Sequence, residues 1–129
     1  MKAIDTNILI RAITGDDPRQ AERANEIIAS GVFVSSGVWI ESEWVLSFSY
    51  HWPRDRIADA LAIFMELATV HAVDLQGLRW ALDRYREGAD WADMIHLVDA
   101  ADVATFVTFD RALARRAGPQ APAHVETVA

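Results

Sequence analysis

The sequence predicts an α/β fold with a mainly parallel central sheet of four to five strands, flanked by about seven helices. Short apolar runs alternate along the chain with segments of helical periodicity, and this alternation is typical of strands joined by crossover helices. The length of 129 residues and the hydrophobic content of 52% indicate one domain, residues 1–129, with a sizeable core.

The elements follow one another without a linker, an internal repeat or a low-complexity tract. Apolar runs predict strands at residues 2–5, 32–34, 70–73 and 105–108, with a weaker one near 124–125. Helical patterns cover residues 8–13, 18–29, 36–50, 53–68, 76–87, 91–101 and 111–117.

Local signals mark several helix ends. Asp17 is placed to cap a helix, because Pro18 suits the first helical position and Gln20 follows the cap by three residues. Gly15 and Gly88 end the helices that precede them, and Asp90 is placed to cap the helix that follows.

Composition excludes several classes of site. The chain has no cysteine, which rules out disulfides, thiolate zinc sites and cysteine nucleophiles and suits a reducing compartment. Its longest uncharged stretch, residues 27–40, is shorter than the roughly 18 apolar residues of a membrane span. Residues 1–3 lead into a strand rather than into a signal peptide, so we expect a cytoplasmic protein without a membrane partner.

The net charge of −7 argues against a nucleic-acid partner, because phosphate binding favours a basic face. The objection weakens if several acids bind a divalent cation, which adds positive charge locally.

Four acids, Asp5, Glu41, Asp93 and Asp110, lie inside or at the edge of apolar segments far apart in the chain. Carboxylates avoid apolar surroundings unless they are paired, hydrogen-bonded or bound to metal. If the fold brings the four together, their oxygens form a cage suited to Mg²⁺ or Mn²⁺.

Each acid also has a structural interpretation. Asp5 is as well explained as a helix cap as it is as a ligand. Glu41 shares a helical stripe with apolar residues, but Glu43 has similar surroundings and periodicity does not separate them. Asp90 has the position of a cap, and this interpretation is weaker for Asp93, whose short side chain reaches back poorly.

Asp110 ends a strand and is also placed to cap the next helix. Asp5 likewise follows a strand, and in parallel sheets ligands bind beyond the carboxyl ends of the strands. We therefore expect both acids at one rim of the sheet, with Thr6, Asn7 and Thr108 as supporting hydroxyl and amide groups.

The ordered motifs resemble those of PIN-domain proteins, and specifically of the VapC toxins of type II toxin–antitoxin pairs. Five segments carry the resemblance, and they extend over residues 1 to about 117: D-T-N-I-L-I-R from Asp5, D-D-P-R-Q from Asp16, E-S-E-W-V-L from Glu41, G-A-D-W-A-D from Gly88 with His96, and T-F-D from Thr108. Trp91 departs from the usual phenylalanine, and Ser42 and Glu43 replace an apolar pair.

The resemblance implies a three-layer PIN-like fold and a Mg²⁺- or Mn²⁺-dependent endoribonuclease. It implies Asp5, Glu41 and Asp93 as metal ligands and favours Glu41 over Glu43. Asp110 would bind a second metal or orient the attacking water, with Asp90 nearby.

The same resemblance implies further binding partners. Arg11 and Arg111 are candidate phosphate contacts for an RNA substrate. The family further implies a homodimer and a cognate VapB-like antitoxin.

Three alternatives remain open from sequence. A phosphatase of the haloacid-dehalogenase type would need a second Asp two residues after the first, where Asn7 stands. A non-catalytic PIN-like RNA-binding or scaffold module is disfavoured by the presence of all four acids. A metal-dependent nuclease acting on DNA would use the same chemistry, since the metal mechanism does not need the 2′-hydroxyl.

Overall fold

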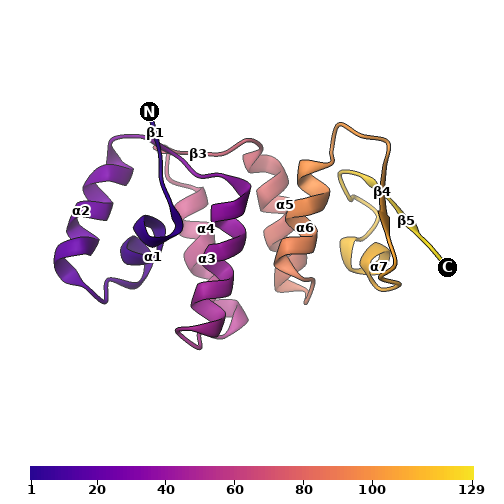
Figure 1. The fold of residues 1–129 in the computed structure, drawn as a ribbon, viewed down its shortest axis with the longest axis horizontal. Helices are drawn as coiled ribbons and strands as arrows, with labels where there is room; N and C mark the ends of the chain where they lie inside the picture. The colour runs from indigo at the N-terminus through magenta and orange to yellow at the C-terminus, as the bar shows by residue number, and fades with distance from the viewer. The chain divides into compact units, whose positions relative to one another are not determined.

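The computed structural model describes all 129 residues, and the chain forms two compact units, Met1–Leu75 and Gln76–Ala129. Figure 1 shows the elements of each unit along the chain. Each unit is described by itself. The single domain expected from chain length therefore stays a prediction.

The N-terminal unit is built on a parallel sheet of three short strands in the order β1-β2-β3. They are β1 (Lys2–Ala3), β2 (Val32–Phe33) and β3 (Val70–His71), with Lys2 opposite Val32 and Val32 opposite Val70. Ile4 continues the pairing by donating its N–H to the carbonyl of Phe33 at 3.1 Å. Parallel neighbours need helical crossovers, and pairs of helices supply them here.

Four helices make these crossovers: α1 (Thr6–Thr14), α2 (Pro18–Ala29), α3 (Ser36–Phe48) and α4 (Arg54–Met65). Helix α1 packs against α2 and α3, and α3 packs against α4 (Figure 1). Their buried faces supply apolar side chains to the core, including Leu9, Ile10, Ile28, Trp39, Leu46, Ile57, Leu61 and Met65.

Local chemistry explains where these helices begin and end. The Asp17 carboxylate accepts from the Gln20 N–H at 3.2 Å with Pro18 at the first position, as the sequence predicts. Gly15 ends α1 in the left-handed conformation, at a φ of 64°. Helix α3 ends at Phe48, two residues before the predicted limit, and His51 just beyond it has a left-handed φ of 57°.

The C-terminal unit contains α5 (Leu75–Arg86) from Gln76 onward, α6 (Trp91–Asp99), β4 (Thr105–Thr108), α7 (Leu113–Ala117) and β5 (His124–Thr127). Strands β4 and β5 are parallel, with Thr105 opposite His124, and α7 packs against β5 (Figure 1). The buried rings of Tyr85 and Trp91 meet edge to face, with centroids 5.7 Å apart.

The predicted class is confirmed: the fold is α/β with seven helices and parallel strands, consistent with the three-layer arrangement. The five strands are within the predicted number, but they hydrogen-bond as one sheet of three strands and another of two. No helix is both long enough and apolar enough to cross a membrane.

Two helix starts differ from the predicted ones by two residues. Helix α1 begins at Thr6 rather than at residue 8. Helix α7 begins at Leu113 rather than at Arg111. The Asp110 carboxylate accepts from the Ala112 N–H at 2.9 Å, two residues on, and so closes an aspartate turn instead of capping a helix. Ala112 then becomes the cap residue and offers no side-chain bond.

Candidate active-site acids and an arginine-lined pocket

Asp5 lies at the junction of β1 and α1 in the N-terminal unit. It is the N-cap of α1, and its Oδ1 accepts from the Ile8 N–H at 3.2 Å. The side chain is exposed, and its other oxygen carries no hydrogen bond within the chain. The cap fixes the carboxylate and leaves one oxygen for a ligand, so the two interpretations of Asp5 are compatible.

The two residues after Asp5 have different surroundings. Thr6 is buried at the first turn of α1, whereas Asn7 is exposed and lines a pocket together with Asp5. Asn7 is therefore placed to contact a molecule in that pocket, and Thr6 is not placed on its lining.

Glu41 lies on α3 with an exposed side chain, while Glu43 is half-buried. The buried face of α3 contains Trp39, Ser42 and Leu46. On the stripe that Glu41 shares with Val38, Val45 and Phe48, the two valines are half-buried and Phe48 is 67% exposed. Glu41 therefore lies at the exposed edge of an apolar stripe, and its role as a metal ligand stays a prediction.

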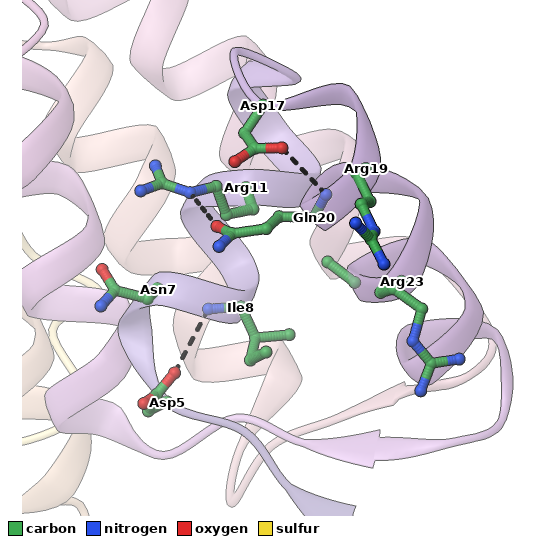
Figure 2. Close-up of a pocket in the computed structure, with 9 residues that line it drawn as sticks. Asp5, Asn7, Ile8, Arg11, Asp17, Arg19, Gln20 and Arg23 are labelled. Atoms are coloured by element: carbon green, nitrogen blue, oxygen red, sulfur yellow. Dashed lines mark hydrogen bonds between the residues drawn. The ribbon is translucent and has the colours of Figure 1, made fainter.

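A pocket of about 700 Å³ lies on the N-terminal unit between α1 and α2 (Figure 2). Nine residues line it: Asp5, Asn7, Ile8, Arg11, Asp17, Arg19, Gln20, Arg23 and Ala24. Three arginines face two aspartates in this lining, so the pocket is locally basic in a chain of net charge −7.

Arg11 is held in a hydrogen-bonded network that ties α1 to the residues beyond α3. Its Nε donates to Gln20 at 2.7 Å, and its Nη1 donates to Asp16 at 3.4 Å and to the Tyr50 hydroxyl at 3.2 Å. The Tyr50 hydroxyl donates to Asp16 at 2.6 Å, as does Thr14 at 2.8 Å. Three of the five donors of the guanidinium are thereby engaged, which leaves only its Nη2 edge for a phosphate.

The network also acts on the ionisation of Asp16. The hydrogen bond from Tyr50 lowers the pKa of the Asp16 carboxyl, the bond from Thr14 lowers it further, and the charge of Arg11 adds to the effect. Asp16 therefore stays ionised to lower pH in the folded chain than in the unfolded chain.

In the C-terminal unit, Asp90 and Asp93 lie at the start of α6. Asp90 is the cap, and its Oδ1 accepts from the Asp93 N–H at 2.9 Å. Asp93 is half-buried one turn on, and no hydrogen bond to its carboxylate is present. Capping explains Asp90, as predicted, and does not explain Asp93.

The surroundings of Asp93 change the pKa of its carboxyl. Partial burial raises the pKa of Asp93, the negative charges of Asp90 and then Asp110 raise it further, and the charge of His96 lowers it. Acids from α6 and from the turn after β4 therefore lie close enough to repel one another.

Asp110 is fixed on both sides in the turn after β4. Its N–H donates to the Thr108 Oγ1 at 3.0 Å, while its own Oδ1 accepts from Ala112. Thr108 thus orients Asp110, a more specific role than the rim support expected of it. Arg111 is exposed next to this turn.

The two units hold different parts of the predicted set. Asp5 and Glu41 belong to the first, and Asp93 and Asp110 to the second. Asp5 and Asp110 follow strands of different sheets, so a shared rim stays a prediction. No group of three or more His, Asp or Glu side chains forms a ready-made metal cluster.

Sequence reasoning missed the pocket residues on α2. Arg19 and Arg23 lie four residues apart, a spacing that places both on one face of a helix, and this signal was readable in the sequence. The Tyr50 link to Asp16 and Arg11 had no such signal, because these residues are far apart in the chain.

Comparison with known proteins identifies a family. The PIN domain family matches residues 2–119, which is most of the chain and includes parts of both units. No curated protein matches the sequence. The chain belongs to the PIN-domain family, whose members are generally metal-dependent nucleases.

Proposed function

We propose that the chain is a Mg²⁺- or Mn²⁺-dependent endoribonuclease that acts as the toxin of a type II toxin–antitoxin pair. Membership of the PIN-domain family supports the nuclease part of this proposal. The VapC-like order of motifs, from D-T-N at Asp5 to T-F-D at Asp110, supports the toxin part.

The observation that carries the proposal is the set of acids in the C-terminal unit. Asp93 has no hydrogen-bond donor on its carboxylate, and the charges of Asp90 and Asp110 oppose its ionisation. Such an arrangement destabilises the chain until a cation or a proton neutralises it. Carboxyl groups with a perturbed pKa cluster at functional sites, so a functional role accounts for Asp93 better than packing does.

The donor chemistry fits the proposed metal. Carboxylate oxygens are the ligands that Mg²⁺ and Mn²⁺ favour, and the chain offers no thiolate. We assign Asp5, Glu41 and Asp93 as the ligands. Asp110 would bind a second ion or orient water, with Asp90 beside it.

A bound divalent cation would supply Lewis-acid stabilisation of the phosphoryl oxygens and would lower the pKa of a coordinated water. The side chains contribute orientation. A backbone N–H donates to one oxygen of each of Asp5, Asp90 and Asp110 and so fixes the orientation of the carboxylate. The second oxygen of each group is left for a ligand. Such preorganisation reduces the reorganisation that the reaction needs.

The toxin proposal carries two protein partners, a second copy of the chain and a VapB-like antitoxin. Trp44 and Phe48 on α3 are 55% and 67% exposed and stack with ring centroids 5.0 Å apart. Exposed aromatic pairs are common at protein interfaces, which supports this face as a contact surface. Trp39, in contrast, is fully buried and belongs to the core.

The proposal is tested with purified protein and a mixed RNA substrate. Cleavage should require Mg²⁺ or Mn²⁺, stop in EDTA, and fall at least about 100-fold in Asp93→Asn and Asp5→Asn, the loss typical of removing a key catalytic group. Asp102→Asn is the matched control for Asp93→Asn, since Asp102 is an exposed acid of the C-terminal unit. This variant should cleave RNA as well as wild type does. Glu41→Gln against Glu43→Gln separates the two neighbouring acids.

Two results would contradict the proposal: full activity in Asp93→Asn, or cleavage that persists in EDTA. A parallel assay on single-stranded DNA tests the DNA alternative. Induced expression of wild type and Asp5→Asn, with mapping of RNA 5′ ends, tests the toxin role. Growth arrest by both proteins would count against a nuclease toxin.

A further inference from the structure

The pocket on the N-terminal unit contains arginines to which the proposed metal site gives no role. Its volume of about 700 Å³ lies within the roughly 300–1,000 Å³ of ordinary ligand sites. Figure 2 shows Asp5 at one end of this pocket and the side chains of Arg19 and Arg23 along α2 at the other. The arginines therefore face the same space as an acid proposed to act in catalysis.

Arg19 and Arg23 are available to an anionic ligand. Arg19 is exposed and makes no hydrogen bond or ion pair within the chain. Arg23 pairs only with Glu26, at 2.7 Å, and the two side chains are 71% and 54% exposed. Exposed pairs of this kind add little to stability, so a phosphate can displace Glu26 at small cost.

The other charges of the pocket are already engaged. Arg11 donates to Gln20, Asp16 and Tyr50, and its guanidinium points away from Arg19 and Arg23 in Figure 2. Asp17 and Asp5 each accept a backbone N–H at 3.2 Å, which partly offsets their negative charge. Arg19 and Arg23 are thus the pocket cations that are least engaged within the chain.

The pocket lining also has an apolar part, Ile8 and Ala24, and Figure 2 shows Ile8 between Asp5 and the side chains of Arg19 and Arg23. A nucleotide matches this combination, because it joins an anionic phosphate to a base whose flat faces can pack against apolar side chains. An acidic peptide would satisfy the arginines and leave the apolar part unused. The spacing of four residues places the two guanidinium groups on one face of α2, suited to consecutive phosphates of one strand.

We propose that this pocket binds the phosphodiester backbone of single-stranded RNA beside the cleaved bond, with Arg19 and Arg23 each contacting a phosphate. The proposal rests on the proposed endoribonuclease function, and it assigns the residues that position the substrate. In a chain of net charge −7, two such arginines supply a local attraction that the whole molecule lacks.

The test is the affinity for a fluorescently labelled single-stranded RNA, followed by anisotropy across a range of salt concentrations. Binding is measured in EDTA and, with Mg²⁺, in the Asp93→Asn background, so that cleavage does not interfere. The variant is Arg19→Gln/Arg23→Gln. The control is Lys2→Gln/Arg115→Gln, which removes the same charge from exposed positions outside the pocket.

For single strands, each phosphate contact contributes about 0.7 to the slope of log K against log salt. Losing two contacts should lower that slope by about 1.4 and weaken binding about 25-fold at 0.1 M salt. The control should keep the wild-type slope. Both double variants should melt at the wild-type temperature, because all four side chains are exposed.

Several outcomes overturn the proposal: no RNA binding by wild type in either condition, unchanged affinity in the pocket variant, or equal losses in both doubles. Displacement of RNA by polyglutamate at matched charge concentration would assign the pocket to an acidic polypeptide instead. The proposed function fails separately. A wild type that binds RNA through the pocket but does not cleave it with Mg²⁺ would refute the nuclease and keep the pocket.

Discussion

Replacing Gly88 by alanine should destabilise the C-terminal unit. Gly88 follows α5 at a φ of 103°, beyond the left-handed well that alanine tolerates. The turn is a Schellman motif: the Gly88 N–H donates to Tyr85 and the Ala89 N–H donates to Arg84, both at 3.0 Å. An alanine Cβ would lie 2.8 Å from Nη1 of Arg116.

The size of the effect follows from these two features. A non-glycine residue in so sparsely populated a region costs about 1–3 kcal/mol. The clash adds little, because the tip of Arg116 is flexible and its bond to the Gly88 carbonyl is long, at 3.4 Å. For a chain of this size, a loss of 1 kcal/mol lowers the melting temperature by roughly 3–5 °C.

Thermal and urea unfolding of Gly88→Ala and Gly37→Ala provide the assay. Gly37 is inside α3, with no neighbouring atom closer than 4.0 Å to a new Cβ. Alanine at that helical position should stabilise the chain by about 0.5–1 kcal/mol. The two substitutions should therefore have opposite signs, and a Gly88→Ala protein as stable as wild type would refute the reasoning.

Two further predictions concern pH. Because the pKa of Asp93 is raised above 3.8, its ionisation lowers the stability of the folded chain; this cost is absent below about pH 3.8 and complete above the folded pKa. Asp93→Asn should therefore be more stable than wild type at pH 7 in EDTA and should lose that advantage in acid. Equal melting curves of the two proteins at both pH values would contradict this. Because the pKa of Asp16 is lowered, the stability that its ionised carboxylate contributes is complete above about pH 3.8 and is lost as pH falls through the folded pKa. Tyr50→Phe should therefore melt at a lower temperature than wild type at pH 7. A difference in melting temperature that persists unchanged in acid would argue against the Tyr50–Asp16 hydrogen bond as its source.

The elements of the fold were largely predictable because their signals are local. Pro18 after Asp17, and Asp90 before an apolar helix, act through bonds that span three residues. The alternation of apolar runs and helical stripes then determines the class, since parallel strands need crossovers. Helix ends without a side-chain cap, such as the end of α3, carry weaker signals and shifted by two residues.

What sequence did not predict depends on contacts between distant residues. The grouping of five strands into sheets of three and two follows from pairing partners, which no local pattern encodes. The sequence predicted Arg11 as a phosphate contact with no partner in the chain, because Tyr50 is 39 positions away and no local pattern indicates its hydrogen bond to Arg11. The exposure of Glu41 likewise depends on which face of α3 meets the core.

The capping and ligand interpretations of the acids are not alternatives. A carboxylate has two oxygens, and Asp5, Asp90 and Asp110 each give one to a backbone N–H. That bond determines the orientation of the side chain and leaves the second oxygen for another partner. Asp93 differs, because no N–H donates to its carboxylate, and because partial burial and then the charges of Asp90 and Asp110 raise its pKa. Within the C-terminal unit, Asp90 and Asp110 are fixed carboxylates whose charges act on Asp93. Asp93 is therefore the position at which substitution should separate a nuclease from a structural role most clearly.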